Sequence, residues 1–168
     1  MYEQRLVRNF IVRAYDYINK LYDGAFDDVN LIVTANEFEC SSYLYKYDEK
    51  TGAVINPRVR ICIEEFDCDD FQTRHYNKEF GTKLEHKYLV VMLRILCHEM
   101  SHHLNIERYK DKEEEYLECL NYIQEIYEYG TEERKRAYRM IPEEYAADEC
   151  AVKILSIHLN RLLALYRD

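Results

Sequence analysis

The segment from Tyr88 to Leu104 constrains the fold of this chain most strongly, because it joins an apolar run directly to a closely spaced group of histidines. The run YLVVMLRILC leads straight into HEMSHHL, so His98 and His102 stand four residues apart with Glu99 between them. On a helix, residues i and i+4 project from the same face, so both imidazoles can reach one point. The segment therefore predicts a buried helix that presents H-E-x-x-H on a rigid element.

A catalytic zinc ion needs a third protein ligand and an open fourth position. The later stretch IPEEYAADECAVKIL supplies a candidate in Glu144, with Asp148 one helical turn further along. We predict that Glu144 completes the metal site and that Asp148 accepts the other ring N–H of a ligating histidine, with His98 as the expected donor. The alanines of this stretch are small enough to let two helices approach closely. Glu143 is interpreted as an acidic residue favoured by the helix dipole.

Other polar residues receive more limited interpretations. Glu99 is expected to lie beside the metal, where a carboxylate can take a proton from water. Stabilisation of a developing oxyanion would need a hydrogen-bond donor, and the sequence leaves four candidates open. These are His75, Tyr109, Tyr138 and Tyr145. His103 points about 100° away from His102 around the helix, so it is interpreted as solvent-facing or as a local hydrogen-bond donor.

The first part of the chain predicts a helix followed by a small sheet. Apolar side chains between Val7 and Tyr22 fall on one helical face, and LIVTA at 31–35 is typical of a strand. Two further strands, SSYLYKY and AVINPRVRICIEEF, flank a hairpin loop in which Gly52 suits the left-handed position. The second of them alternates apolar and polar residues from Val59 onward, which predicts one buried face. Pro57 cannot donate a ladder hydrogen bond, so this strand is expected to begin there or to lie at an edge.

The second part predicts helices after a long loop at 67–81. Their expected ranges are about 82–105, 111–129, 131–140 and 142–165, with Gly130 as a stop and Pro142 in a first turn. The order of helix, sheet and helices favours a single α+β domain over residues 1–168.

Charge and composition exclude several classes of protein. The 168 residues carry a formal net charge of −9, which disfavours binding to nucleic acid and to anionic membranes. The basic run RKRAYR follows Glu132 and Glu133 and is interpreted as a solvated helix face. Neither a signal peptide nor a membrane span is apparent, and six dispersed cysteines fit reduced thiols, so a soluble cytoplasmic protein is expected. Cys97 and Cys150 are interpreted as small core residues.

The pattern HEMSH, followed some forty residues later by EYAAD, resembles the gluzincin metallopeptidases and, among them, the minimal ImmA/IrrE-like group. The resemblance covers about residues 58–155. It implies an active-site helix, a second helix with a glutamate ligand, and a short sheet whose edge strand receives an extended peptide. It assigns one zinc ion per chain to His98, His102 and Glu144. It also makes Glu99 the general base and implies that Asp148 contacts a ligand without contacting the metal itself.

The predicted function is therefore zinc-dependent endopeptidase activity on a specific protein, bound as an extended strand along 58–66 or 42–47. One alternative is a catalytically inactive zinc-containing interaction module of the same fold, against which an intact Glu99 argues. A protease of DNA-bound proteins, like the SprT-like group, is disfavoured by the acidic balance and the lack of a zinc ribbon. A third alternative is a helical domain with an accidental motif. The sequence specifies neither the substrate nor an oligomeric state.

Overall fold

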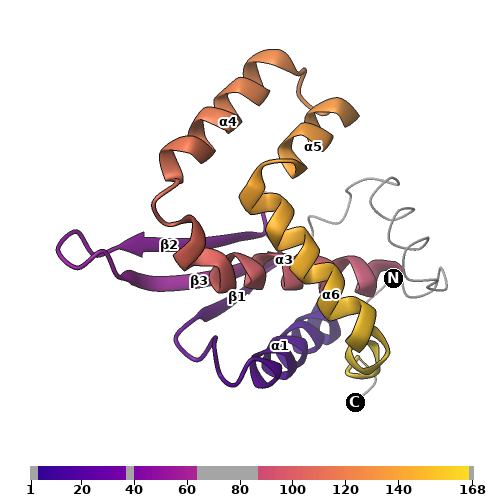
Figure 1. Ribbon diagram of the computed structural model, residues 1–168. Helices are drawn as coiled ribbons and strands as arrows, with labels where there is room; N and C mark the ends of the chain where they lie inside the picture. The colour runs from indigo at the N-terminus through magenta and orange to yellow at the C-terminus, as the bar shows by residue number, and fades with distance from the viewer. Residues whose placement is uncertain (1–3, 37–39, 64–86, 167–168) are drawn as a thin grey trace.

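The computed structural model describes residues 4–36, 40–63 and 87–166. Within them the chain forms a helix, a mixed three-stranded sheet and then four more helices, which confirms the predicted α+β class (Figure 1). The predicted loop at 67–81 lies outside the described residues. The elements are α1 (Gln4–Leu21), β1 (Asn30–Thr34), β2 (Ser42–Tyr47), β3 (Val54–Cys62), α3 (Lys87–Tyr109), α4 (Glu113–Ile126), α5 (Glu132–Arg139) and α6 (Pro142–Ala164).

The strand that contains Pro57 is the central one, because the sheet has the order β1-β3-β2. The prediction that this strand starts at Pro57 or lies at an edge is therefore wrong. β3 pairs in parallel with β1 only from Arg58 onward, and its antiparallel pairing with β2 shifts register between Leu44 and Lys46. Pro57 falls in this irregularity, beside Asn56 with φ 52°, where the ladder does not need its missing N–H.

Other local predictions for the sheet are confirmed. Gly52 has φ 66° in the loop between β2 and β3, in the left-handed region that glycine adopts without strain. Val59 and Ile61 are fully buried and Ile63 nearly so, as the alternating pattern predicts, whereas Cys62, expected on the opposite face, is fully buried as well.

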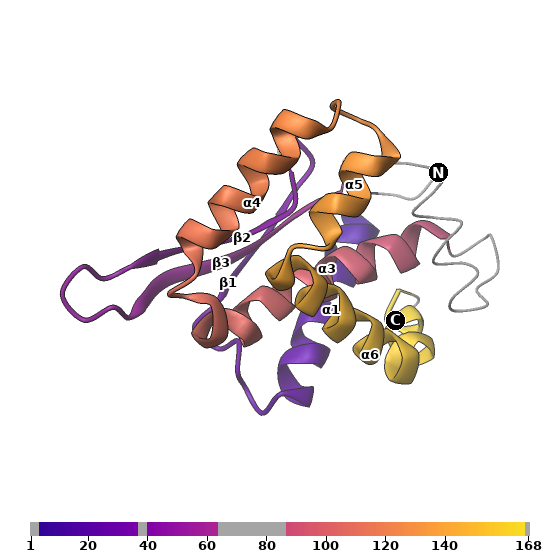
Figure 2. The ribbon, with the colours of Figure 1, turned by 45° about the horizontal axis from the view of Figure 1, so that its top comes forward.

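Helix α3 lies at the centre of the molecule and is buried on all sides over most of its first half. It packs most extensively against α6, and also against β3, α1 and β2. Ala147 and Ala151 on α6 are fully buried, which agrees with the close helix approach that their size allows. Figures 1 and 2 show α4 and α5 as a pair that extends beyond this body, with β2 as the strand nearest α4.

The helix boundaries follow the predicted signals with small differences. α3 continues to Tyr109 and α4 ends at Ile126. Gly130, with φ 82°, separates α4 from α5, and Pro142 is the first residue of α6. None of the described helices is long and apolar enough to cross a membrane. The described cysteines are free thiols, and Cys97 is buried in the core as predicted.

Candidate metal centre

Two helices bring the three predicted ligands together. His98 and His102 lie one turn apart on α3, and Glu144 lies in the first turn of α6, the helix that packs most closely on α3. One ligand atom from each residue falls within 4.8 Å of the others, so this group could hold a metal ion. The i, i+4 spacing on one helix and the glutamate on the next therefore converge as the sequence predicts.

The distances between these atoms fit a small tetrahedral ion. His98 Nε2 lies 3.1 Å from His102 Nε2 and 3.2 Å from Glu144 Oε2, and His102 Nε2 lies 3.8 Å from that oxygen. Zinc ligands bind at about 2.0–2.2 Å, so tetrahedral geometry places neighbouring donor atoms about 3.3 Å apart. Two imidazole nitrogens and a carboxylate oxygen are also a donor set that Zn²⁺ accepts.

Asp148 contacts the ring nitrogen of His98 that faces away from the other two candidate ligands. Its Oδ1 atom lies 2.9 Å from His98 Nδ1 and also accepts a hydrogen bond from Arg94, whose side chain is buried on α3. Burial lowers the pKa of His98, but the hydrogen bonds to Asp148 and Glu144 outweigh it and raise the pKa to about 9. The contact leaves Nε2 of His98 directed toward the other ligands, which is the orientation that a metal requires.

His102 has partners on two elements. Its Nδ1 atom lies 3.5 Å from a carboxylate oxygen of Glu143, so this glutamate contacts a ligand in addition to its favourable place at the helix N-terminus. The ring of Tyr43 on β2 stacks against His102 with centroids 6.5 Å apart. The same tyrosine hydroxyl lies 2.7 Å from His103 Nδ1. His103 is therefore a half-buried residue outside the ligand group, and of its two predicted roles the structure shows the local hydrogen bond and not the solvent-facing position.

Glu144 is the most buried of the three ligands, with 3% of its surface exposed. Tyr116 on α4 donates a hydrogen bond of 2.9 Å to its Oε1, which leaves Oε2 for the histidines. Burial raises the pKa of Glu144, but its hydrogen bond to His98 and the charges of both histidines outweigh this effect and lower it. The carboxylate is therefore ionised at neutral pH, as a metal ligand must be.

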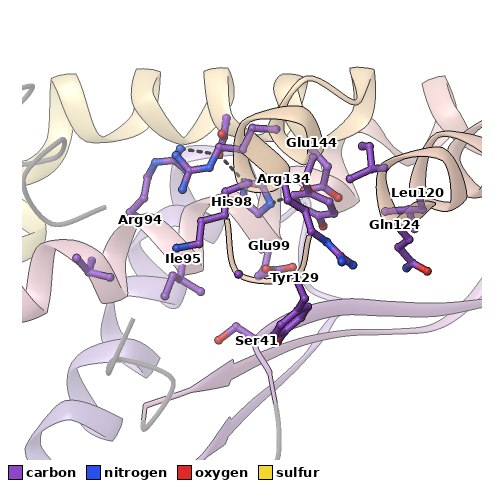
Figure 3. Close-up of a pocket in the computed structure, with 17 residues that line it drawn as sticks. Ser41, Arg94, Ile95, His98, Glu99, Leu120, Gln124, Tyr129, Arg134 and Glu144 are labelled. Carbon is purple, nitrogen blue, oxygen red and sulfur yellow. Dashed lines mark hydrogen bonds and ion pairs between the residues drawn. The ribbon is translucent and has the colours of Figure 1, made fainter. Parts of the chain in front are cut away.

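Two of the three candidate ligands, His98 and Glu144, line a cleft of about 560 Å³. Glu99, 9% exposed, lines the same cleft, and Figure 3 shows it next to His98. The remaining walls come from α4, the turn at 129–130, α5, and Ser41 just before β2. A carboxylate, a potential metal ion and space for a ligand thus meet in one cavity.

The structure distinguishes between the four residues that were predicted as possible oxyanion stabilisers. Tyr138 lines the cleft with 38% of its surface exposed, and the desolvation of its hydroxyl beside the Glu144 carboxylate raises its pKa, so the phenol stays protonated and can donate. Tyr109 donates instead to the backbone oxygen of Pro142 and lies outside this cleft. Tyr145 is 48% exposed and also absent from the cleft wall, so neither of these two tyrosines lines the cavity. His75 lies outside the described residues.

Three residues of the centre were not found from the sequence. Arg94 carried a usable signal, because a cation in an apolar run one turn before His98 must meet a carboxylate if it is buried. Glu143 and Tyr116 carried none. Their contacts depend on how α4 and α6 approach α3, which no local pattern encodes.

Comparisons with family models, curated proteins and solved structures find no match to this chain. The resemblance to gluzincins therefore rests on the ligand pattern alone, and the geometry of the site carries the functional argument.

Proposed function

We propose that the protein is a zinc-dependent endopeptidase of the gluzincin type, most similar to the ImmA/IrrE-like group. The observation that carries the proposal is the convergence of His98, His102 and Glu144 on one point, with Glu99 on the wall of the same cleft. A purely structural zinc site would usually close all four positions with protein ligands. The described residues around this point supply three ligands and open onto a cleft.

Each residue then has a defined task. A bound zinc ion would supply Lewis-acid activation of water and of the scissile carbonyl. Glu99 accepts a proton from the attacking water as the oxygen of that water bonds to the carbonyl carbon. Glu99 then delivers that proton to the amide nitrogen as the C–N bond breaks. Asp148 keeps His98 in one tautomer, and Tyr138 donates a hydrogen bond to the developing oxyanion.

The substrate is expected to bind as an extended strand along β2. Of the two segments that the sequence suggested, 58–66 offers no edge within β3, which lies between β1 and β2, and its last residues, 64–66, lie outside the described residues. β2 has a strand partner on one side only within the described residues. Its residue Tyr43 faces His102, and Ser41 lines the cleft, so a peptide added to this edge would pass the metal site.

The test combines metal analysis with cleavage. We expect one zinc ion per purified chain, with loss of zinc in Glu144→Ala. The wild type should produce cleavage products in a proteome-wide screen that Glu99→Gln, which keeps its zinc, does not produce. Glu107→Gln, an exposed glutamate on the same helix, serves as the control and should cleave as the wild type does.

Two results would contradict the proposal. Zinc at one per chain without cleavage that depends on Glu99 would favour a zinc-containing interaction module. Absence of zinc, or zinc content unaffected by Glu144→Ala, would show that the three ligands do not form the metal site.

A further inference from the structure

The basic run on α5 faces the cleft. The sequence alone suggested a solvated helix face, but Arg134, Lys135 and Arg139 line the same cavity as Glu99 and Glu144. All three cations are partly buried. Figure 3 shows Arg134 among the side chains that surround the cleft. A protein with a net charge of −9 thus places three cations of α5 in the lining of the cleft that also contains His98 and Glu144.

Some of this positive charge is already balanced. Arg94, also on the wall, pairs with Asp148. Lys135 pairs with Glu132 at 3.1 Å.

The other two cations are not balanced in this way. Arg134 lies over the ring of Tyr129, 5.2 Å from its centroid, a contact that holds the guanidinium without neutralising it. Within residues 4–36, 40–63 and 87–166, neither Arg134 nor Arg139 has a carboxylate partner. Two guanidinium groups therefore remain available to an anionic ligand in the cleft.

We infer that this cleft selects peptides that carry a carboxylate near the scissile bond, bound by Arg134 and Arg139. The inference rests on the proposed peptidase function and names its substrate class. A guanidinium presents a planar fork of donors that matches a carboxylate, and a partly buried setting strengthens the attraction. The carboxylate can belong to an aspartate or glutamate side chain or to a free C-terminus. Without these arginines, the overall negative charge would repel such peptides.

The experiment uses the zinc-loaded full chain and a peptide library with capped ends. Peptides with Asp or Glu at one position near the scissile bond are compared with the same peptides carrying Asn or Gln. We expect kcat/KM to be about tenfold higher, or more, for the acidic member of each pair. The preference should largely disappear in the double variant Arg134→Gln/Arg139→Gln. Arg136→Gln, an exposed cation on the same helix, is the matched control and should keep the preference.

Two further arms sharpen the result. Arg134→Glu should reverse the selection toward Lys or Arg at the same position, a gain that misfolding cannot produce. Peptides with free and amidated C-termini identify the source of the carboxylate. A preference for free ends alone assigns the arginines to the chain terminus, and a preference within capped peptides assigns them to an acidic side chain.

The failure of this inference differs from that of the proposed function. Cleavage that depends on Glu99 but is equal for acidic and amide peptides would overturn the inference and leave the peptidase intact. If no such cleavage occurs, the peptidase proposal fails. In that case, fluorescence anisotropy measures how tightly the same capped and free-ended peptides bind to Glu99→Gln. This binding decides whether the cleft selects peptides that carry a carboxylate. Equal binding of acidic and amide peptides would overturn the inference, and tighter acidic binding that Arg134→Gln/Arg139→Gln abolishes would support it.

Discussion

Replacing Asp148 with asparagine removes the carboxylate that joins Arg94 to His98. Burial raises the pKa of Asp148, but its hydrogen bond to His98 and the charge of Arg94 outweigh this effect and lower it from 3.8 to about 2. One pKa unit corresponds to about 1.4 kcal/mol, so the surroundings stabilise the ionised carboxylate by about 2 kcal/mol. We expect Asp148→Asn to lower the free energy of unfolding of the metal-free protein by a similar amount, and its Tm by about 4 to 8 °C.

The same change should weaken zinc binding by about 10- to 100-fold, because His98 loses the carboxylate that orients it and raises its basicity. Competition with a chromophoric chelator measures this affinity, and thermal and urea denaturation measure stability. Arg94→Met/Asp148→Asn should recover most of the lost stability, since a buried guanidinium no longer lacks a counter-ion. Its zinc affinity should stay low. Glu149→Gln, an exposed residue on the same helix, is the control.

Two results would refute this reasoning. Zinc binding by Asp148→Asn as tight as in the wild type would mean that the carboxylate does not orient His98. Recovery of zinc affinity in the double variant would mean that the unpaired Arg94 alone disturbs the site. The stability difference between wild type and Asp148→Asn should also narrow as pH falls from 3.8 through about 2, because the carboxyl of the folded protein then becomes protonated.

Three other perturbations test separate parts of the structure. Tyr116→Phe removes the hydrogen bond to Glu144 and should lower zinc affinity about tenfold in the same chelator assay, whereas Tyr122→Phe, exposed on the same helix, should not. In the metal-free protein, hydrogen bonds raise the pKa of His98 from 6.5 to about 9 despite burial, so its stabilising effect is complete below pH 6.5 and lost as pH rises through 9. Between pH 6.5 and 9 the Tm of the metal-free wild type should therefore fall more than that of His98→Gln. If the Tm values of both proteins change in parallel with pH, the raised pKa of His98 is contradicted. Gly52→Ala should cost about 1 kcal/mol in urea denaturation, because φ is 66° but the added Cβ meets no atom within 4 Å; a loss above about 3 kcal/mol would indicate a contact that the hairpin does not show.

Several features could be predicted from the sequence because they depend on short stretches of chain. The spacing of His98 and His102 places them on one helical face whatever surrounds the helix. Gly52, Gly130 and Pro142 act through their own backbone preferences, so the hairpin and the helix ends follow from them. Glu144 and the alanines after it predicted a second helix that could approach the first closely.

Other features depend on how distant segments meet, and only the tertiary structure decided them. Pro57 sits in the central strand because a register irregularity with β2 and the late start of β1 remove the need for its N–H. Of the tyrosine candidates, only Tyr138 reaches the cleft, because the packing of α5 against α6 determines which of its side chains face the candidate metal ligands. Arg134 likewise faces the cleft instead of solvent.

There is a physical reason why some features could be predicted from the sequence and others could not. Local dihedral preferences and helical periodicity act over a few residues, so the sequence by itself determined which groups could bind a metal and on which helices they lie. Which residues support that site, and which charges face its cleft, depends on packing between α3, α4, α5 and α6, where side-chain shape and burial select one arrangement of the elements. The motif therefore predicted the ligands, whereas the packing placed Arg94, Tyr116 and the arginines of α5 around them.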